Sequence, residues 1–246
     1  VEAKDNKHNL GDGMQQGIDY AKILDIPFVY SSNGDGFLEH DMKQGTEREI
    51  PLDAFPSPEE LWHRFTSVSN YTPEQEALIS EPYYFAPGDK TPRYYQRIAI
   101  NRTIEAIARG KSRILLVMAT GTGKTYTAFQ IIHRLWKSGT KKKILFLADR
   151  NILVDQTMTQ DFKPFAKVML KIGENEQKDA EGNKILDSSY EIYLALYQQL
   201  AGDDNKEPFR AFTPEFFDLI IIDECHRGSA KEDSQWRKIL NYFNSA

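Results

Sequence analysis

Seven consecutive residues near the middle of the 246-residue chain have the composition of a phosphate-binding loop. They are Ala119, Thr120, Gly121, Thr122, Gly123, Lys124 and Thr125. Glycines allow the backbone to close around an anion, and the N–H groups at the start of a following helix present positive potential to it. Lys124 would reach the β- and γ-phosphates of a nucleotide, and the Thr125 hydroxyl would ligate Mg²⁺. One departure is Met118, because the strict motif has glycine at that position.

Two adjacent carboxylates lie farther along the chain, after an apolar run. Leu219 to Ile222 has the length and composition of a buried strand, and Asp223 and Glu224 follow it directly. Asp223 would hold Mg²⁺ through water, and Glu224 would polarise the water that attacks the γ-phosphate. An acidic turn after a core strand is common by itself, but its place downstream of the phosphate loop favours a nucleotide-hydrolysing site that uses Mg²⁺.

A glutamine upstream of the loop is the candidate for selecting the base of the nucleotide. Gln96 lies about 28 residues before Lys124. A glutamine amide can form two hydrogen bonds with N6 and N7 of adenine. The predicted nucleotide is therefore ATP rather than GTP.

The segments around these motifs alternate between strand and helix patterns, which is typical of an α/β fold with a parallel sheet. One helix is expected over 95–109, ended by Gly110, and another from Lys124 to a stop at Gly139. The polar stretch 173–189 indicates an insertion or a loop. Five apolar runs of strand length are expected to form the sheet: Arg113 to Met118, Ile144 to Ala148, Val168 to Ile172, Ile192 to Leu196 and Leu219 to Ile222.

The first part of the chain predicts a hairpin and a helix. Strands are expected over 26–31 and 37–42, joined by a turn at 33–36 that requires positive φ. Ser57 has the features of a helix N-cap, with Pro58 in the first helical position. These patterns indicate a mixed α/β segment ahead of the parallel sheet.

A proline-containing stretch without periodicity separates this segment from the rest of the chain. It covers residues 70–91 and indicates a connector. The predicted organisation is therefore a first domain over 1–69, the connector over 70–91, and a nucleotide-binding lobe over 92–246.

Charge is distributed unevenly around a formal net charge of −5. Residues 90–170 contain 16 Lys or Arg against 4 Asp or Glu, whereas residues 1–89 contain 6 against 17 and residues 171–246 contain 9 against 15. A basic middle block with acidic flanks favours a polyanion such as nucleic acid as a partner of that block. A solvated helical face would give the same count.

The single cysteine, Cys225, excludes an internal disulfide and a thiolate metal cluster, which fits a reducing compartment. The sequence contains no run of roughly 18 apolar residues and no secretory signal pattern. We therefore expect a cytoplasmic protein without a membrane partner.

The second half of the chain resembles superfamily 2 helicases, in the order and spacing of several motifs. The segments that carry the resemblance are Gln96, 119–125, 147–156, 195–198 and 223–226. The resemblance covers about residues 90–246 and implies a first RecA-like lobe of an ATP-driven motor. It also implies phosphate contacts to nucleic acid from Arg150 and Asn151, a position near the strand track for Gln198, and coupling of nucleotide to motion by His226.

The first residues resemble the later part of a PD-(D/E)xK nuclease motif, at Val1 to Lys4. Side chains alternate along a strand, so Glu2 and Lys4 would face the same side, with Glu2 toward a metal and Lys4 toward the scissile phosphate. Gln16 and Tyr20 lie one helical turn apart and resemble the Q-x-x-x-Y element beside this nuclease core. An exposed strand followed by an amphipathic helix is the alternative interpretation.

A nuclease element followed by a helicase-like motor resembles the motor and endonuclease subunit of type I restriction enzymes. The motif Asp-Glu-Cys-His-Arg-Gly at 223–228 adds to the resemblance. It implies tracking along double-stranded DNA, driven by ATP and Mg²⁺, in a complex with methyltransferase and specificity subunits, and cleavage of that DNA. The first nuclease aspartate is expected before Val1, and a second RecA-like lobe with its arginine finger after Ala246.

Two other functions fit parts of the same pattern. One is a superfamily 2 translocase without a nuclease, acting in repair or RNA sensing, in which the acidic first 89 residues regulate or dock. The other is a catalytically silent, nucleotide-dependent scaffold. Cleavage of DNA separates the first from the nuclease hypothesis, and nucleotide turnover separates the second from both.

Overall fold

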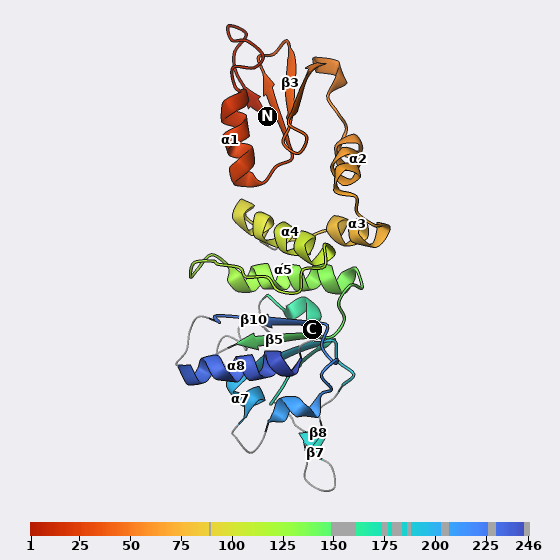
Figure 1. Ribbon diagram of the computed structural model, residues 1–246, viewed down its shortest axis with the longest axis vertical. Helices are drawn as coiled ribbons and strands as arrows, with labels where there is room; N and C mark the ends of the chain where they lie inside the picture. Colours follow the sequence, from red (N-terminus) through yellow and green to blue (C-terminus); the bar gives the residue numbers. More distant parts are fainter. Residues whose placement is uncertain are drawn as a thin grey trace. The chain divides into compact units, whose positions relative to one another are not determined.

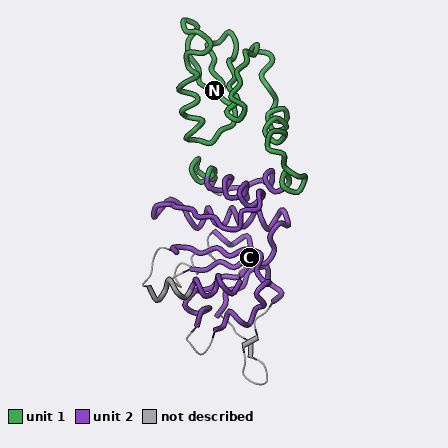
Figure 2. The backbone as a smooth tube through the Cα atoms, viewed as in Figure 1, with its two compact units in different colours: residues 1–77, 92–98 green, residues 78–91, 99–246 purple. Residues whose placement is uncertain are grey.

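The structure is a computed structural model that describes residues 1–88, 90–148, 161–173, 177–178, 184–185, 188–202, 207–225 and 230–243. The chain divides into two compact units (Figure 2). Unit 1 comprises residues 1–77 and 92–98, and unit 2 comprises residues 78–91 and 99–246. In the described part of the chain, no helix is both long enough and apolar enough to cross a membrane.

Unit 1 contains a four-stranded sheet in the order β1-β2-β3-β4. Its strands are β1 (Glu2–Ala3), β2 (Phe28–Ser32), β3 (Gly36–Asp41) and β4 (Thr46–Pro51). The first pair is parallel and the others are antiparallel. The predicted hairpin is confirmed as β2 and β3, and Gly34 in its turn has a φ of 95°. Strand β4 is not predicted by the sequence pattern, because its exposed and charged residues give no apolar alternation.

Three helices and one 3-10 turn complete the first part of the chain. They are α1 (Met14–Leu24), η1 (Leu52–Ala54), α2 (Pro58–Ser69) and α3 (Pro73–Ser80). The predicted start of α2 is confirmed, because the Ser57 side chain accepts a hydrogen bond from the Glu60 N–H at 3.1 Å. Helix α3 lies within the stretch that the prolines mark as a connector. Thr72 and Gln75 cap it reciprocally, through hydrogen bonds of 2.8 and 3.4 Å.

Unit 2 is built on a parallel sheet in the order β10-β5-β9-β6, which confirms the predicted α/β fold with a parallel-sheet domain. The strands are β5 (Ile144–Ala148), β6 (Met169–Lys171), β9 (Ile192–Leu196) and β10 (Leu219–Ile222). The helices of this part of the chain are α4 (Tyr94–Ala108), α5 (Lys124–Lys137), α7 (Tyr197–Ala201) and α8 (Ala230–Tyr242), with 3-10 turns η2 (Lys163–Phe165) and η3 (Pro208–Ala211).

The two faces of this sheet bury alternate residues of the central strand β5. Phe146 packs in one apolar cluster with Phe129 and Ile132 of α5. Leu147 packs in the other cluster with residues of α7 and α8, including Ile239. Figure 1 shows α5 and α8 on opposite sides of β5 and β10. The sheet therefore holds α5, and with it the start of that helix at Lys124, in a fixed relation to the strand ends.

One predicted strand is wrong. Residues 113–118 form no strand, and Leu115 and Val117 are 74% and 88% exposed. Within the described residues, β10 pairs with β5 only, so the expected fifth strand is missing from the sheet. An apolar run of this length predicts burial only if a partner is available, and periodicity carries no information about the partner.

The polar stretch 173–189 contains more structure than a loop. Its described residues include β7 (Gln177–Lys178) and β8 (Lys184–Ile185), which pair antiparallel with each other. Strands of two residues are too short to show an alternating pattern in the sequence.

Candidate functional site

The carboxyl ends of the parallel strands gather several predicted site residues on one edge of the sheet. The register aligns Ile222 at the end of β10 with Leu147, and Leu196 at the end of β9 with Ala148. Asp223 follows β10, and its N–H donates to the Leu147 carbonyl at 2.8 Å. Ligands of open α/β sheets bind in crevices outside this edge. The predicted Mg²⁺ ligand Asp223 is therefore where the fold places ligands.

Gln198 belongs to the same edge. It lies in α7, which starts directly after β9, and its side chain is half-buried. The predicted DNA-contact residues Arg150 and Asn151 and the predicted coupling residue His226 lie outside the described residues.

The candidate phosphate loop ends in the N-terminus of α5, a helix of 14 residues. Gly121 and Gly123 both adopt the left-handed conformation, with φ of 79° and 82°. A side chain would strain the backbone at either position. Thr122 Oγ1 donates to the Ala119 carbonyl at 2.6 Å, which closes the turn. Thr120 is exposed and Thr125 is half-buried in the first helical turn. A tight turn that opens into a helix N-terminus fits a bound phosphate group.

The strongest contact in this region joins the two halves of the predicted nucleotide site. The Lys124 ammonium lies 2.7 Å from Oε1 of Glu224, and the two side chains are 22% and 8% exposed. Glu224 has a φ of 55°, a conformation that non-glycine residues rarely adopt. Such outliers cluster at functional sites, where the surrounding structure imposes them. The lysine and the carboxylate that the sequence assigns to one reaction are therefore in direct contact.

Gln96 belongs to unit 1 in the division of the chain. It is buried, and its Oε1 accepts the N–H of Arg93 at 2.9 Å. The amide oxygen thus already stabilises the first turn of α4.

A second group of predicted residues forms a continuous chain of hydrogen bonds in unit 1. Lys4 Nζ donates to Oε1 of Glu2 and to Oε1 of Gln16, at 3.1 Å each. Nε2 of Gln16 donates to the hydroxyl of Tyr20 at 3.0 Å. Lys4 directly follows β1, and its contact with Glu2 places the two side chains on the same side, as the period of two in an extended chain predicts. The four residues proposed for a nuclease site are thus in contact with one another.

Two glycines let α1 approach β1 and β2 this closely. A Cβ atom at Gly13 would lie 2.8 Å from Cγ of Glu2 and from Oγ of Ser31. A Cβ atom at Gly17 would lie 2.6 Å from Cγ1 of Val29. These distances are too short for real carbon contacts, so the close approach depends on glycine. A pocket of about 200 Å³ lies beside this contact, lined in part by Glu2, Gly17, Tyr20 and Val29.

A metal ion at this second site would have one carboxylate from the described chain. Glu2 supplies it, and its Oε1 is held by Lys4. No group of three or more His, Cys, Asp or Glu residues gathers anywhere in the part of the chain that the structure describes. The donor set fits a metal only with ligands besides Glu2.

Sequence reasoning missed a buried charge cluster in unit 1. Glu39 is 2% exposed and accepts hydrogen bonds from Arg64 Nη2 at 2.7 Å, Arg48 Nε at 2.8 Å and the Tyr30 hydroxyl at 2.6 Å. Burial raises the pKa of the Glu39 carboxyl, but these hydrogen bonds outweigh burial and lower its pKa to about 2. The cluster joins β2, β3, β4 and α2, so its role is to hold the sheet and helix together.

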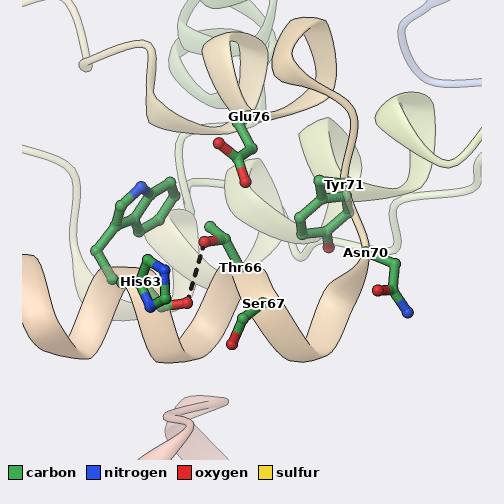
Figure 3. Close-up of a pocket in the computed structure, with 7 residues that line it drawn as sticks. His63, Thr66, Ser67, Asn70, Tyr71 and Glu76 are labelled. Carbon is green, nitrogen blue, oxygen red and sulfur yellow. Dashed lines mark hydrogen bonds between the residues drawn. The ribbon is translucent and has the colours of Figure 1, made fainter.

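A pocket of about 480 Å³ also lies in unit 1, between α2 and α3. Figure 3 shows the Glu76 carboxylate pointing into the space above Thr66, with Tyr71 beside it. The described lining contains none of the sequence-predicted site residues. The Thr66 hydroxyl donates to the His63 carbonyl of its own helix at 3.2 Å.

Comparisons with known proteins give a consistent result. A family model described as "Type III restriction enzyme, res subunit" matches residues 89–246. The chain is 56% identical, over its whole length, to the type I restriction enzyme EcoAI endonuclease subunit of Escherichia coli, of which it covers 30%. It is 32% identical to the EcoKI endonuclease subunit of Escherichia coli strain K12, matching 89% of this chain and 20% of that protein.

A solved structure extends the similarity to three dimensions. The fragment structure of an HsdR subunit of a type I restriction enzyme from Vibrio vulnificus YJ016 matches with a TM-score of 0.75 and 39% identity. The match covers 99% of this chain and 40% of that one. The chain thus spans less than a third of the length of the curated relatives named above.

Proposed function

The chain belongs to the family of type I restriction enzyme endonuclease subunits. We propose that it joins a DNA-cleaving site to an ATP-driven DNA motor. The contact between Lys124 and Glu224 is the observation that carries the proposal. It brings the cation for the phosphates and the carboxylate for the attacking water to one place, beside the N-terminus of α5.

In the motor site, Lys124 and the amides of residues 120–125 bind the phosphates of ATP, and Gln96 selects adenine. Thr125 would ligate Mg²⁺ and Asp223 would hold it through water, and the ion would neutralise phosphate charge when it is bound. Glu224 orients and deprotonates the attacking water. Since Lys124 pairs with Glu224 in this structure, binding of phosphate transfers the ammonium from the carboxylate to the nucleotide. That exchange frees Glu224 for its role as base.

In the nuclease site, Glu2 is a ligand for a divalent metal and Lys4 faces the scissile phosphate of double-stranded DNA. Gln16 holds the Lys4 ammonium, and Tyr20 in turn holds the amide of Gln16. This chain of hydrogen bonds restricts the positions that the ammonium can occupy. Tyr20 also lines the adjoining pocket and would form part of the surface that the DNA backbone contacts.

The remaining roles follow from the family. Arg150, Asn151 and Gln198 contact DNA, and His226 couples the nucleotide to movement. The subunit acts in the cytoplasm with methyltransferase and specificity subunits, which read the DNA sequence. Translocation along DNA by the motor then precedes cleavage.

Two variants of the full-length subunit, assembled with its partner subunits, test the two sites separately. Lys124→Ala is expected to abolish DNA-stimulated ATP hydrolysis and therefore cleavage. Glu2→Ala is expected to leave ATP hydrolysis unchanged and abolish cleavage. Unchanged hydrolysis in the Lys124 variant contradicts the motor site. Retained cleavage in the Glu2 variant contradicts the nuclease site. ATP hydrolysis without any cleavage by the unaltered complex would instead favour a translocase without a nuclease.

A further inference from the structure

We propose that Tyr126, Gln130 and Arg134 clamp the segment 79–90 to the phosphate-binding helix, so that binding of nucleotide at Lys124 changes the stability of that segment. The proposal rests on the proposed ATP site and adds a route by which the site acts on the chain outside it. The three residues are positioning residues, since none of them is expected to touch the nucleotide.

The three side chains lie at intervals of four residues, which places them on one stripe of α5. Each binds the backbone of the segment 79–90. The Tyr126 hydroxyl donates to the Lys90 carbonyl at 2.7 Å, and Arg134 Nη2 donates to the Ile79 carbonyl at 2.5 Å. The segment is therefore held along α5 at both of its ends.

Gln130 binds the middle of the segment through both the oxygen and the nitrogen of its side-chain amide. Oε1 accepts the Tyr84 N–H at 2.9 Å, and Nε2 donates to the Tyr84 carbonyl at 3.1 Å. Nε2 also donates to the Tyr126 hydroxyl at 3.0 Å, which links two of the clamping side chains. Gln130 is fully buried. A buried amide that pairs with both backbone groups of one residue is specific, because loss of either partner leaves a polar group unsatisfied.

Arg134 adds a second anchor near the start of the segment. Its Nη1 donates to Oδ1 of Asn101 at 2.8 Å, and the Tyr83 hydroxyl donates to the same oxygen at 2.7 Å. The guanidinium carbon also lies 5.3 Å from the centre of the Tyr83 ring. Arg134 is 3% exposed. Burial of an arginine without these acceptors would be costly, so the segment and the helix stabilise each other.

The clamped segment coincides with a crossing of the chain between the two units. Unit 1 ends its first stretch at residue 77 and resumes at residue 92, so that 78–91 is the portion of unit 2 between them. Helix α5 begins at Lys124, and Tyr126 lies within its first turn. Any reorganisation of that turn when Lys124 exchanges Glu224 for phosphate is therefore carried to the Lys90 carbonyl. Because α5 is packed on the sheet, the helix transmits the same change through Gln130 to Tyr84 and through Arg134 to Ile79.

Hydrogen exchange of the full-length subunit, with and without Mg²⁺ and a non-hydrolysable ATP analogue, tests the clamp. The analogue is expected to slow exchange both in the phosphate loop and in the segment 79–90. Gln130→Leu is expected to keep the first effect and lose the second. Tyr126→Phe removes the bond to the Lys90 carbonyl and the bond from Gln130 Nε2, but keeps both bonds of Gln130 to Tyr84, so it should lose the effect at the carboxyl end of the segment. Lys137→Gln, at an exposed position of the same helix, is the control.

The outcomes separate this inference from the proposed function. If the analogue protects the phosphate loop of the unaltered subunit but leaves 79–90 unchanged, the clamp carries no signal and the inference is wrong. If neither region responds, the ATP site itself is wrong.

A second readout in the assembled complex measures the ratio of cleavage to ATP hydrolysis. For Tyr126→Phe we expect hydrolysis near the unaltered rate and a fall of about fivefold or more in cleavage per ATP, the lower range of measured coupling between sites. A merely structural role would instead lower the thermal midpoint and reduce both activities in parallel, which would also overturn the inference.

Discussion

Replacement of Glu224 by glutamine should tighten ATP binding while it stops hydrolysis. The carboxylate lies 2.7 Å from the Lys124 ammonium and is 8% exposed. ATP must compete with this carboxylate for the ammonium, because one lysine cannot hold both at full strength. Glutamine keeps the size of the side chain and removes its charge, so that the competitor is lost and the geometry is kept.

The size of the effect follows from the environment of the pair. A hydrogen bond to a charged group contributes about 1.5–3 kcal/mol when it is well shielded from water. Lys124 is 22% exposed, so solvent screening reduces the contribution below this range. A net gain of about 1 kcal/mol corresponds to roughly fivefold tighter binding of ATP. Removal of a general base typically costs on the order of 10² to 10⁴ in rate.

Titration of the full-length subunit with a fluorescent ATP analogue in Mg²⁺ measures the affinity, and release of phosphate in a single turnover measures the rate. Glu105→Gln is the matched control, since Glu105 makes an ion pair with Arg109 on α4, at 3.2 Å. The control should change neither quantity. Weaker binding of ATP by Glu224→Gln would refute the competition between carboxylate and phosphate. Unreduced hydrolysis would refute the role of Glu224 as base.

Two further changes test unit 1. Because the pKa of Glu39 is lowered to about 2 from an ordinary value of 4.5, its contribution to stability is complete above pH 4.5 and is lost as the pH falls toward 2. Urea unfolding at pH 7 and pH 3 should show Glu39→Gln less stable than the unaltered chain at pH 7, with a smaller difference at pH 3; an equal difference at both values would contradict the cluster. Gln16→Leu should reduce DNA cleavage by about tenfold or more without changing ATP hydrolysis, since positioning shells of this kind affect activity by about 10–100-fold. Gln15→Leu, whose amide bonds the exposed Asp19 instead, should leave cleavage unchanged, and equal losses in both variants would refute the role of Gln16.

Local signals in the sequence predicted the local structure well. The N-cap at Ser57 and the turn at Gly34 depend on chemistry within four residues, and both are confirmed. Strands β5 and β9 contain no charged residue and are buried at every position, so their burial on both faces could be inferred. The spacing of motifs, together with this alternation, was sufficient for the fold class.

Features that depend on distant partners could not be predicted. Residues 114–118 are as apolar as the true strands, yet they pair with no described strand, and Leu115 and Val117 are exposed. Glu39 reads as one more surface charge until Arg64, 25 residues away, is placed against it. Likewise the contact of Lys124 with Glu224 joins residues that lie far apart in the sequence. Sequence patterns name such residues, but only the fold pairs them.

The close approach at Gly13 and Gly17 has an evolutionary consequence. Every replacement of glycine adds a Cβ atom, and at these positions it would collide with Glu2, Ser31 or Val29. Any amino-acid replacement there would therefore push α1, which carries Gln16, away from β1 and from Lys4 next to it. It would break the 3.1 Å hydrogen bond between Lys4 and Gln16. These two positions, which contribute no functional group, should tolerate less sequence drift than the exposed residues around them. Conservation of the candidate nuclease site would therefore depend on keeping both positions free of side chains.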